Sequence, residues 1–133
     1  MIKFYYRDVK SPVFEKIKRP FANICIQSRS GKWIQFRPLI DSGADITLIP
    51  HSLGVYLGFE MEDKIVEFGG VTGRHLPVII KKIKIKIGDI ESEPRVAWSL
   101  IEEAPPILGR LDIFNKFEIT FKEDEGWVEF NPL

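Results

Sequence analysis

Residues 39–50, with the sequence LIDSGADITLIP, form the stretch that decides the fold. A carboxylate, Asp41, and a hydroxyl, Ser42, lie on a glycine turn between two apolar segments with the composition of strands. Asp-Ser-Gly alone is a weak signal, since such triplets usually form surface turns. Here, however, apolar segments run directly into both sides of the turn. The pattern therefore predicts a carboxylate at the end of a buried strand, where burial and neighbouring charge can prepare it for acid–base chemistry.

The chain has 133 residues, a length that suits one domain with a modest core. Its 19 basic and 19 acidic residues balance, so no overall charge attracts it to nucleic acid or to an anionic membrane. The single cysteine, Cys25, excludes an intrachain disulfide. Residues 1–6 are too short an apolar run for a signal peptide, and no stretch approaches the roughly 18 apolar residues of a membrane span. We therefore expect a cytoplasmic protein without a membrane partner.

Apolar and polar residues alternate through much of the chain without a long 3.6-residue period, so the fold is predicted to be mainly β with one or two short helices. Two strands are expected at residues 21–27 and 33–40, around a hairpin loop that contains glycine. Residues 46–49 are expected to form the next strand. Residues 51–57 are then expected to make a helical turn that ends at a glycine.

A second hairpin is expected from residues 64–68 and 76–87, joined by a glycine-rich tip at residues 69–73. Within its second strand, residues 82–87 alternate strictly between lysine and isoleucine. This alternation places the isoleucines in the core and the lysines in water. Another strand is expected at residues 91–98.

The last part of the chain is predicted to contain a short helix at residues 111–116 and a C-terminal hairpin within residues 117–133. Residues 1–20 are the least readable part, and we interpret them as an N-terminal arm with an opening strand. No repeat, linker or low-complexity tract divides the sequence. We therefore predict a single domain over residues 1–133.

A second motif lies downstream at residues 106–110, with the sequence PILGR. Together with the Asp-Ser-Gly turn it resembles the retroviral-type aspartic proteases, the retropepsins, over about residues 21–121. The resemblance implies the retropepsin-like acid-protease fold, a closed β-barrel or sandwich that works as a homodimer. It also implies an aspartic-type endopeptidase, a hydrolase that cuts extended polypeptide and needs no cofactor or metal ion.

Aspartic proteolysis needs two carboxylates about 3 Å apart that share one proton, so that one activates water while the other donates to the carbonyl oxygen. The chain offers one candidate, Asp41, which favours a homodimer with the pair across a two-fold axis. By resemblance, Ser42 braces the paired loops and Gly43 donates its backbone N–H to the carboxylate. The alternative for Gly43 is a simple turn residue. We expect a bell-shaped, acid-shifted pH profile of activity.

The resemblance also implies roles for residues beside these motifs. Ala44 and Asp45 are expected to contact substrate, and Asp45 is expected to form an ion pair with Arg110. The alternative for this aspartate is an exposed charge that contributes little. Ile107, which follows two prolines, is expected to line an apolar substrate pocket, although core packing is the usual place of an isoleucine.

The glycine-rich tip resembles the flap that closes over bound peptide, so Gly69, Gly70 and Val71 are expected to contact substrate. Glycine-rich hairpins also occur without moving. An extended peptide would bind through its backbone, so the expected substrate is an unfolded segment. Retropepsins pair their termini in a shared sheet, and residues 117–133 are the candidate here. The alternative is that this hairpin caps the single chain.

Other chemistries find little support in the sequence. The two histidines, His51 and His75, do not have the spacing of a zinc site, and Cys25 lies in an apolar strand without an electropositive neighbour. Two rival hypotheses stay open. One is a non-catalytic retropepsin-like module for peptide binding or dimerisation. The other is a nucleic-acid-binding barrel that uses the lysines of residues 82–87, although such lysines are more typical of a solvated face.

Overall fold

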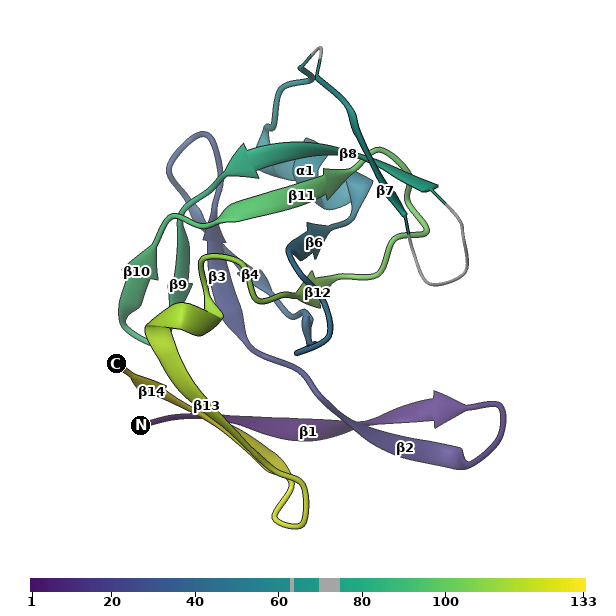
Figure 1. Ribbon diagram of the computed structural model, residues 1–133, viewed down its shortest axis with the longest axis vertical. Helices are drawn as coiled ribbons and strands as arrows, with labels where there is room; N and C mark the ends of the chain where they lie inside the picture. The colour runs from purple at the N-terminus through teal and green to yellow at the C-terminus, as the bar shows by residue number, and fades with distance from the viewer. Residues whose placement is uncertain (63, 70–74) are drawn as a thin grey trace.

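The computed structural model describes residues 1–62, 64–69 and 75–133. Strands dominate this part of the chain, with one α-helix, α1 (His51–Leu57), and one short 3-10 helix, η1 (Phe114–Lys116). The strands form three sheets (Figure 1). The prediction of a mainly β fold is confirmed. The prediction of a closed barrel is wrong for the described strands, which are divided among separate sheets.

The first sheet joins the two ends of the chain and has four antiparallel strands. In spatial order they are β13 (Phe117–Lys122), β14 (Trp127–Pro132), β1 (Ile2–Ser11) and β2 (Glu15–Pro20). Residues 2–5 of β1 pair with β14, whereas residues 6–11 pair with β2. The predicted C-terminal hairpin is thus present, and it pairs with the N-terminal strand of its own chain.

The second sheet also has four strands and contains the first predicted hairpin. In spatial order they are β10 (Ile90–Ser92), β9 (Ile85–Ile87), β3 (Ile24–Gln27) and β4 (Trp33–Phe36).

The third sheet has six strands and carries the decisive stretch. In spatial order they are β5 (Leu39–Ile40), β12 (Ile107–Leu108), β6 (Thr47–Ile49), β11 (Arg95–Ser99), β8 (His75–Lys82) and β7 (Val66–Gly69). The β5–β12 and β6–β11 pairs are parallel. Residues 39–50 therefore enter and leave the Asp41 turn through two strands of one sheet, with β12 between them.

The strand predicted over residues 76–87 is divided between two sheets. β8 pairs with β11 as far as Lys82, and β9 pairs with β3 from Ile85 onward. At the crossing, the backbone N of Ile83 donates to the Pro94 carbonyl at 3.1 Å. All three isoleucines of this segment are buried, as predicted, because both sheets cover the same core. The crossing also ends the hydrogen-bond ladder that a closed barrel would have continued.

Trp98 on β11 fixes helix α1 against the core. Its side chain is 1% exposed, and its Nε1 donates to the His51 carbonyl at 3.1 Å. Gly54 faces this ring, and a Cβ there would lie 2.0 Å from the indole nitrogen. The helix ends at Gly58 with φ 84°, the left-handed conformation that glycine adopts readily. No helix in the described part of the chain is long and apolar enough to cross a membrane.

Candidate active site

Asp41 directly follows β5 and begins a tight loop. Its backbone N donates to the Leu108 carbonyl at 3.1 Å, which ties the end of β5 to β12. The backbone N of Gly43 donates to Asp41 Oδ1 at 2.9 Å, and the backbone N of Ala44 donates to the Asp41 carbonyl at 3.1 Å. The loop thus aims a backbone N–H at the carboxylate. A Cβ at Gly43 would lie only 3.3 Å from Oδ1, so glycine makes this close approach easy.

The tip of the loop faces solvent in the single chain. Asp41 and Ala44 are half-buried, whereas Ser42 and Gly43 are exposed. The carboxylate is therefore held by a sheet on one side, while the two residues that follow it remain accessible. This arrangement leaves space for another molecule directly at the loop.

Residues 106–111 form a strap that holds the loop from its far side. The backbone N of Arg110 donates to the Ala44 carbonyl at 3.0 Å, and that of Leu111 donates to the Asp45 carbonyl at 2.9 Å. Gly109 lies between β12 and Arg110, and its backbone N donates a buried hydrogen bond to Thr47 Oγ1 at 3.0 Å. The structure thus joins the two motifs of the sequence mainly through backbone hydrogen bonds.

The side chains of Asp45 and Arg110 add one contact to this strap. The guanidinium nitrogen of Arg110 donates to Asp45 Oδ1 at 2.7 Å. The two side chains are 89% and 53% exposed, respectively, so solvent screens the pair and its contribution to stability is small. We infer that the backbone bonds, more than the ion pair, fix the loop.

The remaining predicted site residues lie on three different elements. Ile107 is half-buried on β12, between β5 and β6. Gly69 is exposed at the end of β7. Gly70 and Val71 lie outside the described residues. Among the described residues, no group of three or more His, Cys, Asp and Glu side chains is placed to hold a metal ion.

The loop before Ile107 is anchored to helix α1 by Glu102, a residue that the sequence did not single out. Its carboxylate accepts hydrogen bonds from the backbone N of Ser52 at 2.8 Å and from Ser52 Oγ at 2.7 Å. The hydrogen bond from the Ser52 hydroxyl, and to a smaller extent the one from the Ser52 backbone N, hold the pKa of Glu102 below its usual range. Because the partners lie 50 residues apart, no local pattern indicated this contact.

Residues 16–122 match the family model described as retroviral aspartyl protease. The chain belongs to this family. The Asp41 loop and the strap of residues 106–111 both lie within the matched residues. No curated protein matches the chain by sequence.

Solved structures also match the chain, and two of them are described here. A retropepsin-like aspartic protease from Rickettsia conorii is 14% identical with a TM-score of 0.61, and the match covers 92% of this chain and 96% of that one. The EIAV protease complexed with the inhibitor HBY-793 is 22% identical with a TM-score of 0.57, and the match covers 80% of this chain and 92% of that one. At these identities the likeness establishes the fold.

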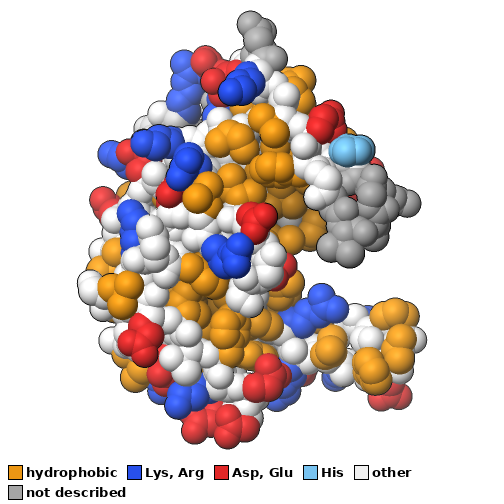
Figure 2. All heavy atoms as spheres, in the orientation of Figure 1, with side chains coloured by type: hydrophobic (Ala, Val, Ile, Leu, Met, Phe, Trp, Pro, Cys, Tyr) orange, Lys and Arg blue, Asp and Glu red, His pale blue; other side chains and the backbone are white. Residues whose placement is uncertain are grey.

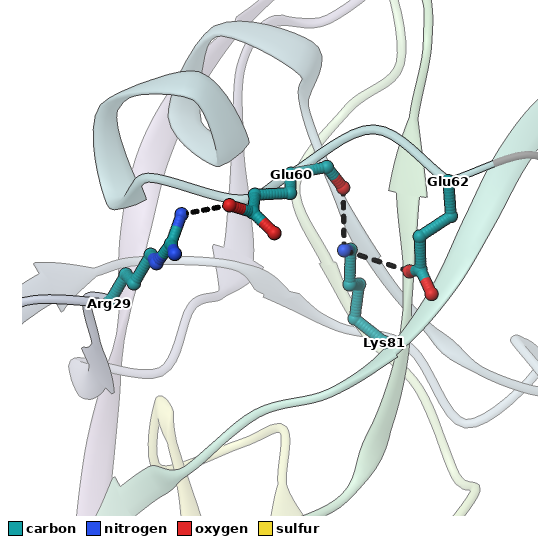
Figure 3. A network of polar contacts seen from close by, with 4 residues as sticks. All are labelled: Arg29, Glu60, Glu62 and Lys81. Atoms are coloured by element: carbon teal, nitrogen blue, oxygen red, sulfur yellow. Dashed lines mark hydrogen bonds and ion pairs between the residues drawn. The ribbon is translucent and has the colours of Figure 1, made fainter.

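A network of four charged side chains holds the segment that leads from α1 toward β7 (Figure 3). Lys81 Nζ on β8 donates to the Glu60 carbonyl at 2.6 Å and lies 2.8 Å from Glu62 Oε2. The Glu60 carboxylate in turn pairs with Arg29. The Lys81 side chain is 17% exposed, so its contacts are better shielded from solvent than the Arg29 pair. Lys81 is thus the central cation of the network.

Replacing Lys81 by Met is expected to lower the free energy of unfolding by about 1–2 kcal/mol, because a charged hydrogen bond to a carbonyl and an ion pair are both lost. Urea denaturation followed by circular dichroism measures the change. Lys84→Met is the matched control, since Lys84 is exposed and belongs to none of these contacts. Equal denaturation midpoints for the two variants would contradict the role of Lys81.

Asp112, two residues after Arg110 and with φ 61°, forms a clamp with Arg95. The Asp112 carboxylate accepts three hydrogen bonds from Arg95: from Nε at 2.8 Å, from a second nitrogen of the same guanidinium at 3.0 Å and from the backbone N at 3.0 Å. The Arg95 side-chain hydrogen bonds, followed by the backbone bond, hold the pKa of Asp112 well below its usual range. This clamp therefore stays charged in moderately acidic solution.

Asp112→Asn is expected to make stability less dependent on pH on the acid side. Because the pKa of Asp112 is lower in the folded chain than in the unfolded chain, the clamp contributes stability above about pH 4 and loses it as pH falls toward the folded value. Asn tolerates the positive φ, so the variant removes the charge and keeps the backbone. Urea midpoints between about pH 2 and pH 6 measure the effect. Parallel curves for wild type and variant would refute it.

Proposed function

We propose that the chain is an aspartic endopeptidase that hydrolyses peptide bonds in extended polypeptide and is active as a homodimer. The observation that carries this proposal is the Asp41 carboxylate, held by the Gly43 N–H at 2.9 Å on a loop whose tip is exposed. Membership of the retroviral aspartyl protease family supports it. One such loop per chain supplies one carboxylate, so a second copy of the chain must supply the other.

In the proposed dimer, the two Asp41 carboxylates share one proton and hold the attacking water between them. The ionised carboxylate takes a proton from the water, while the protonated one donates to the carbonyl oxygen of the scissile bond. Each Gly43 N–H keeps its carboxylate oriented. The exposed Ser42 hydroxyls brace the paired loops.

We further propose that the peptide lies extended between these loops and the β7–β8 hairpin. Its backbone would pair with the protein, while alternate side chains would enter pockets. The proposed contacts on the floor are Ala44, Asp45 and Ile107. Those above the peptide are Gly69, Gly70 and Val71. The catalytic unit is taken to be one domain, residues 1–133.

The test is cleavage of a reduced, alkylated protein at a series of pH values, with the products identified by mass spectrometry. We expect internal cuts between apolar residues and a bell-shaped profile with its maximum at about pH 4–6, because one carboxylate must be ionised and the other protonated. If the dimer binds the unfolded substrate and never cuts it, the result would favour the rival hypothesis, a peptide-binding module without catalysis.

A further inference from the structure

The outer half of β1 and the whole of β2 form a hairpin arm, residues 7–20, that leaves the body of the molecule (Figure 1). Its turn is ordered by Ser11 Oγ, which accepts hydrogen bonds from the backbone N of Val13 and of Phe14, both at 3.2 Å. These two apolar side chains are 74% and 68% exposed, and Ile17 is 37% exposed. Figure 2 shows hydrophobic side chains gathered at the end of the arm. The arm therefore presents an apolar tip on a defined backbone.

The base of the arm is fixed to the strand that delivers Asp41. Phe21, the residue after β2, forms a bridge with Leu39 of β5, and the backbone N of Ala22 donates to the Pro38 carbonyl at 3.0 Å. Figure 1 shows the arm projecting away from the other two sheets, and Figure 2 shows a hollow between the arm and the rest of the molecule. A molecule that covers the exposed tip of the Asp41 loop would thus lie beside the arm.

The edges of the terminal sheet indicate which surfaces remain for such a molecule. β14 is paired on both sides, by β13 and β1, and β1 is paired by β14 and β2. The N-terminal strand β1 and the C-terminal strand β14 thus pair with each other within one chain, and both are internal strands of the sheet. β13 and β2 are the two edge strands of the sheet, and β2 is the more exposed of them, with every residue from Glu15 to Arg19 exposed. An exposed edge strand beside exposed apolar side chains is a ready surface for another chain.

Charge favours a second copy as the occupant. The arm carries five basic and two acidic residues, which leaves 14 basic and 17 acidic residues in the rest of the chain. The arm is thus positively charged and the body negatively charged, so an arm is attracted to the body of another copy. A two-fold axis repeats the contact, because each arm meets the same surface of its partner.

We propose that the arm is a dimer clasp, in which Val13 and Phe14 bind the body of a second copy while the two Asp41 loops meet. This inference rests on the proposed function, since that function requires the second copy. The clasp assigns dimer affinity to a segment outside the Asp41 loop. Dimerisation and chemistry can therefore be separated by substitution.

The test compares V13S/F14S with V55S/Y56S in the Asp41→Asn background, which prevents self-cleavage. Val55 and Tyr56 are the matched control, because they form an adjacent apolar pair on α1 that is 58% and 71% exposed. Sedimentation velocity over a concentration series measures the dimer Kd. We expect V13S/F14S to raise Kd at least about 30-fold, from the lost burial of two apolar side chains, and the control to leave it unchanged. Thermal unfolding monitors the fold of each variant.

An unchanged Kd for V13S/F14S overturns the clasp. Binding of the same variant to vesicles of anionic phospholipid is measured as well, because an apolar tip among lysines also suits a membrane surface. An unchanged Kd overturns the clasp whatever the vesicles show. The outcome is distinguishable from failure of the proposed function. A wild-type dimer that cleaves no peptide would defeat the function and leave the clasp standing. A wild-type enzyme that cleaves while its tip variant dimerises equally well would defeat the clasp alone.

Discussion

Replacing Asp41 by Asn is expected to lower kcat by at least about 1000-fold and to leave the fold intact. The amide has nearly the same shape as the carboxylate, and its oxygen still accepts the hydrogen bond that Gly43 N makes to Asp41 Oδ1 at 2.9 Å. The loop therefore keeps its geometry. In the proposed dimer, however, the amide could neither take a proton from water nor share one with the second Asp41 carboxylate, so we expect the chemical step to be lost.

The measurement is kcat on one peptide at the pH of maximal activity, with circular dichroism and sedimentation as checks on fold and assembly. Asp89→Asn is the matched control, because Asp89 is an exposed carboxylate in the turn before β10. It should retain wild-type kcat. If Asp41→Asn kept more than about a tenth of the wild-type activity, the assignment of Asp41 as the catalytic carboxylate would be wrong, since general acid–base catalysis alone contributes more than this.

Gly109→Ala is expected to have the largest effect on stability, a loss of about 3 kcal/mol or more in the free energy of unfolding. A Cβ at this position would lie 2.3 Å from both the carbonyl carbon and the oxygen of Ile46, and 2.8 Å from the backbone N of Thr47. All three are backbone atoms, so no side chain can rotate away. Relief would require the strap to leave the Asp41 loop and would break the bond from Gly109 N to Thr47 Oγ1.

Urea denaturation at one fixed protein concentration measures this loss, because the stability of the proposed dimer would depend on protein concentration. Gly69→Ala is the control, since a Cβ at Gly69 meets no heavy atom within 4 Å. Its stability is expected to change by less than about 0.5 kcal/mol. Similar midpoints for the two variants would show that the strap is not closely packed against the loop.

The sequence predicted the elements that depend on neighbouring residues. The hairpin of β3 and β4, the strand β6 and the helix α1 with its glycine end all follow from local periodicity and turn chemistry. The two motifs at residues 39–50 and 106–110 were each visible for the same reason. The structure brings them together through parallel pairing of β5 with β12.

The features that the sequence did not predict depend on distant partners. Alternation of Lys and Ile continues across residues 82–87, so periodicity alone could not locate the crossing between β8 and β9. The contacts of Glu102 with Ser52 and of Arg95 with Asp112 join segments that lie far apart in the sequence. The C-terminal hairpin pairs with β1 of its own chain, and no local pattern in the sequence indicated that β1 would be its partner.

The central claim is that each active site contains one Asp41 from each of two chains, and mixing tests it most directly. Wild-type protein and the Asp41→Asn variant are combined in equal amounts, above the dimer Kd, and allowed to exchange subunits. If the site is shared, only dimers with two wild-type chains are active, so activity falls to about one quarter of that of the same total amount of wild type. If each chain carries its own complete site, activity falls to about one half, and the account of a shared carboxylate pair is contradicted.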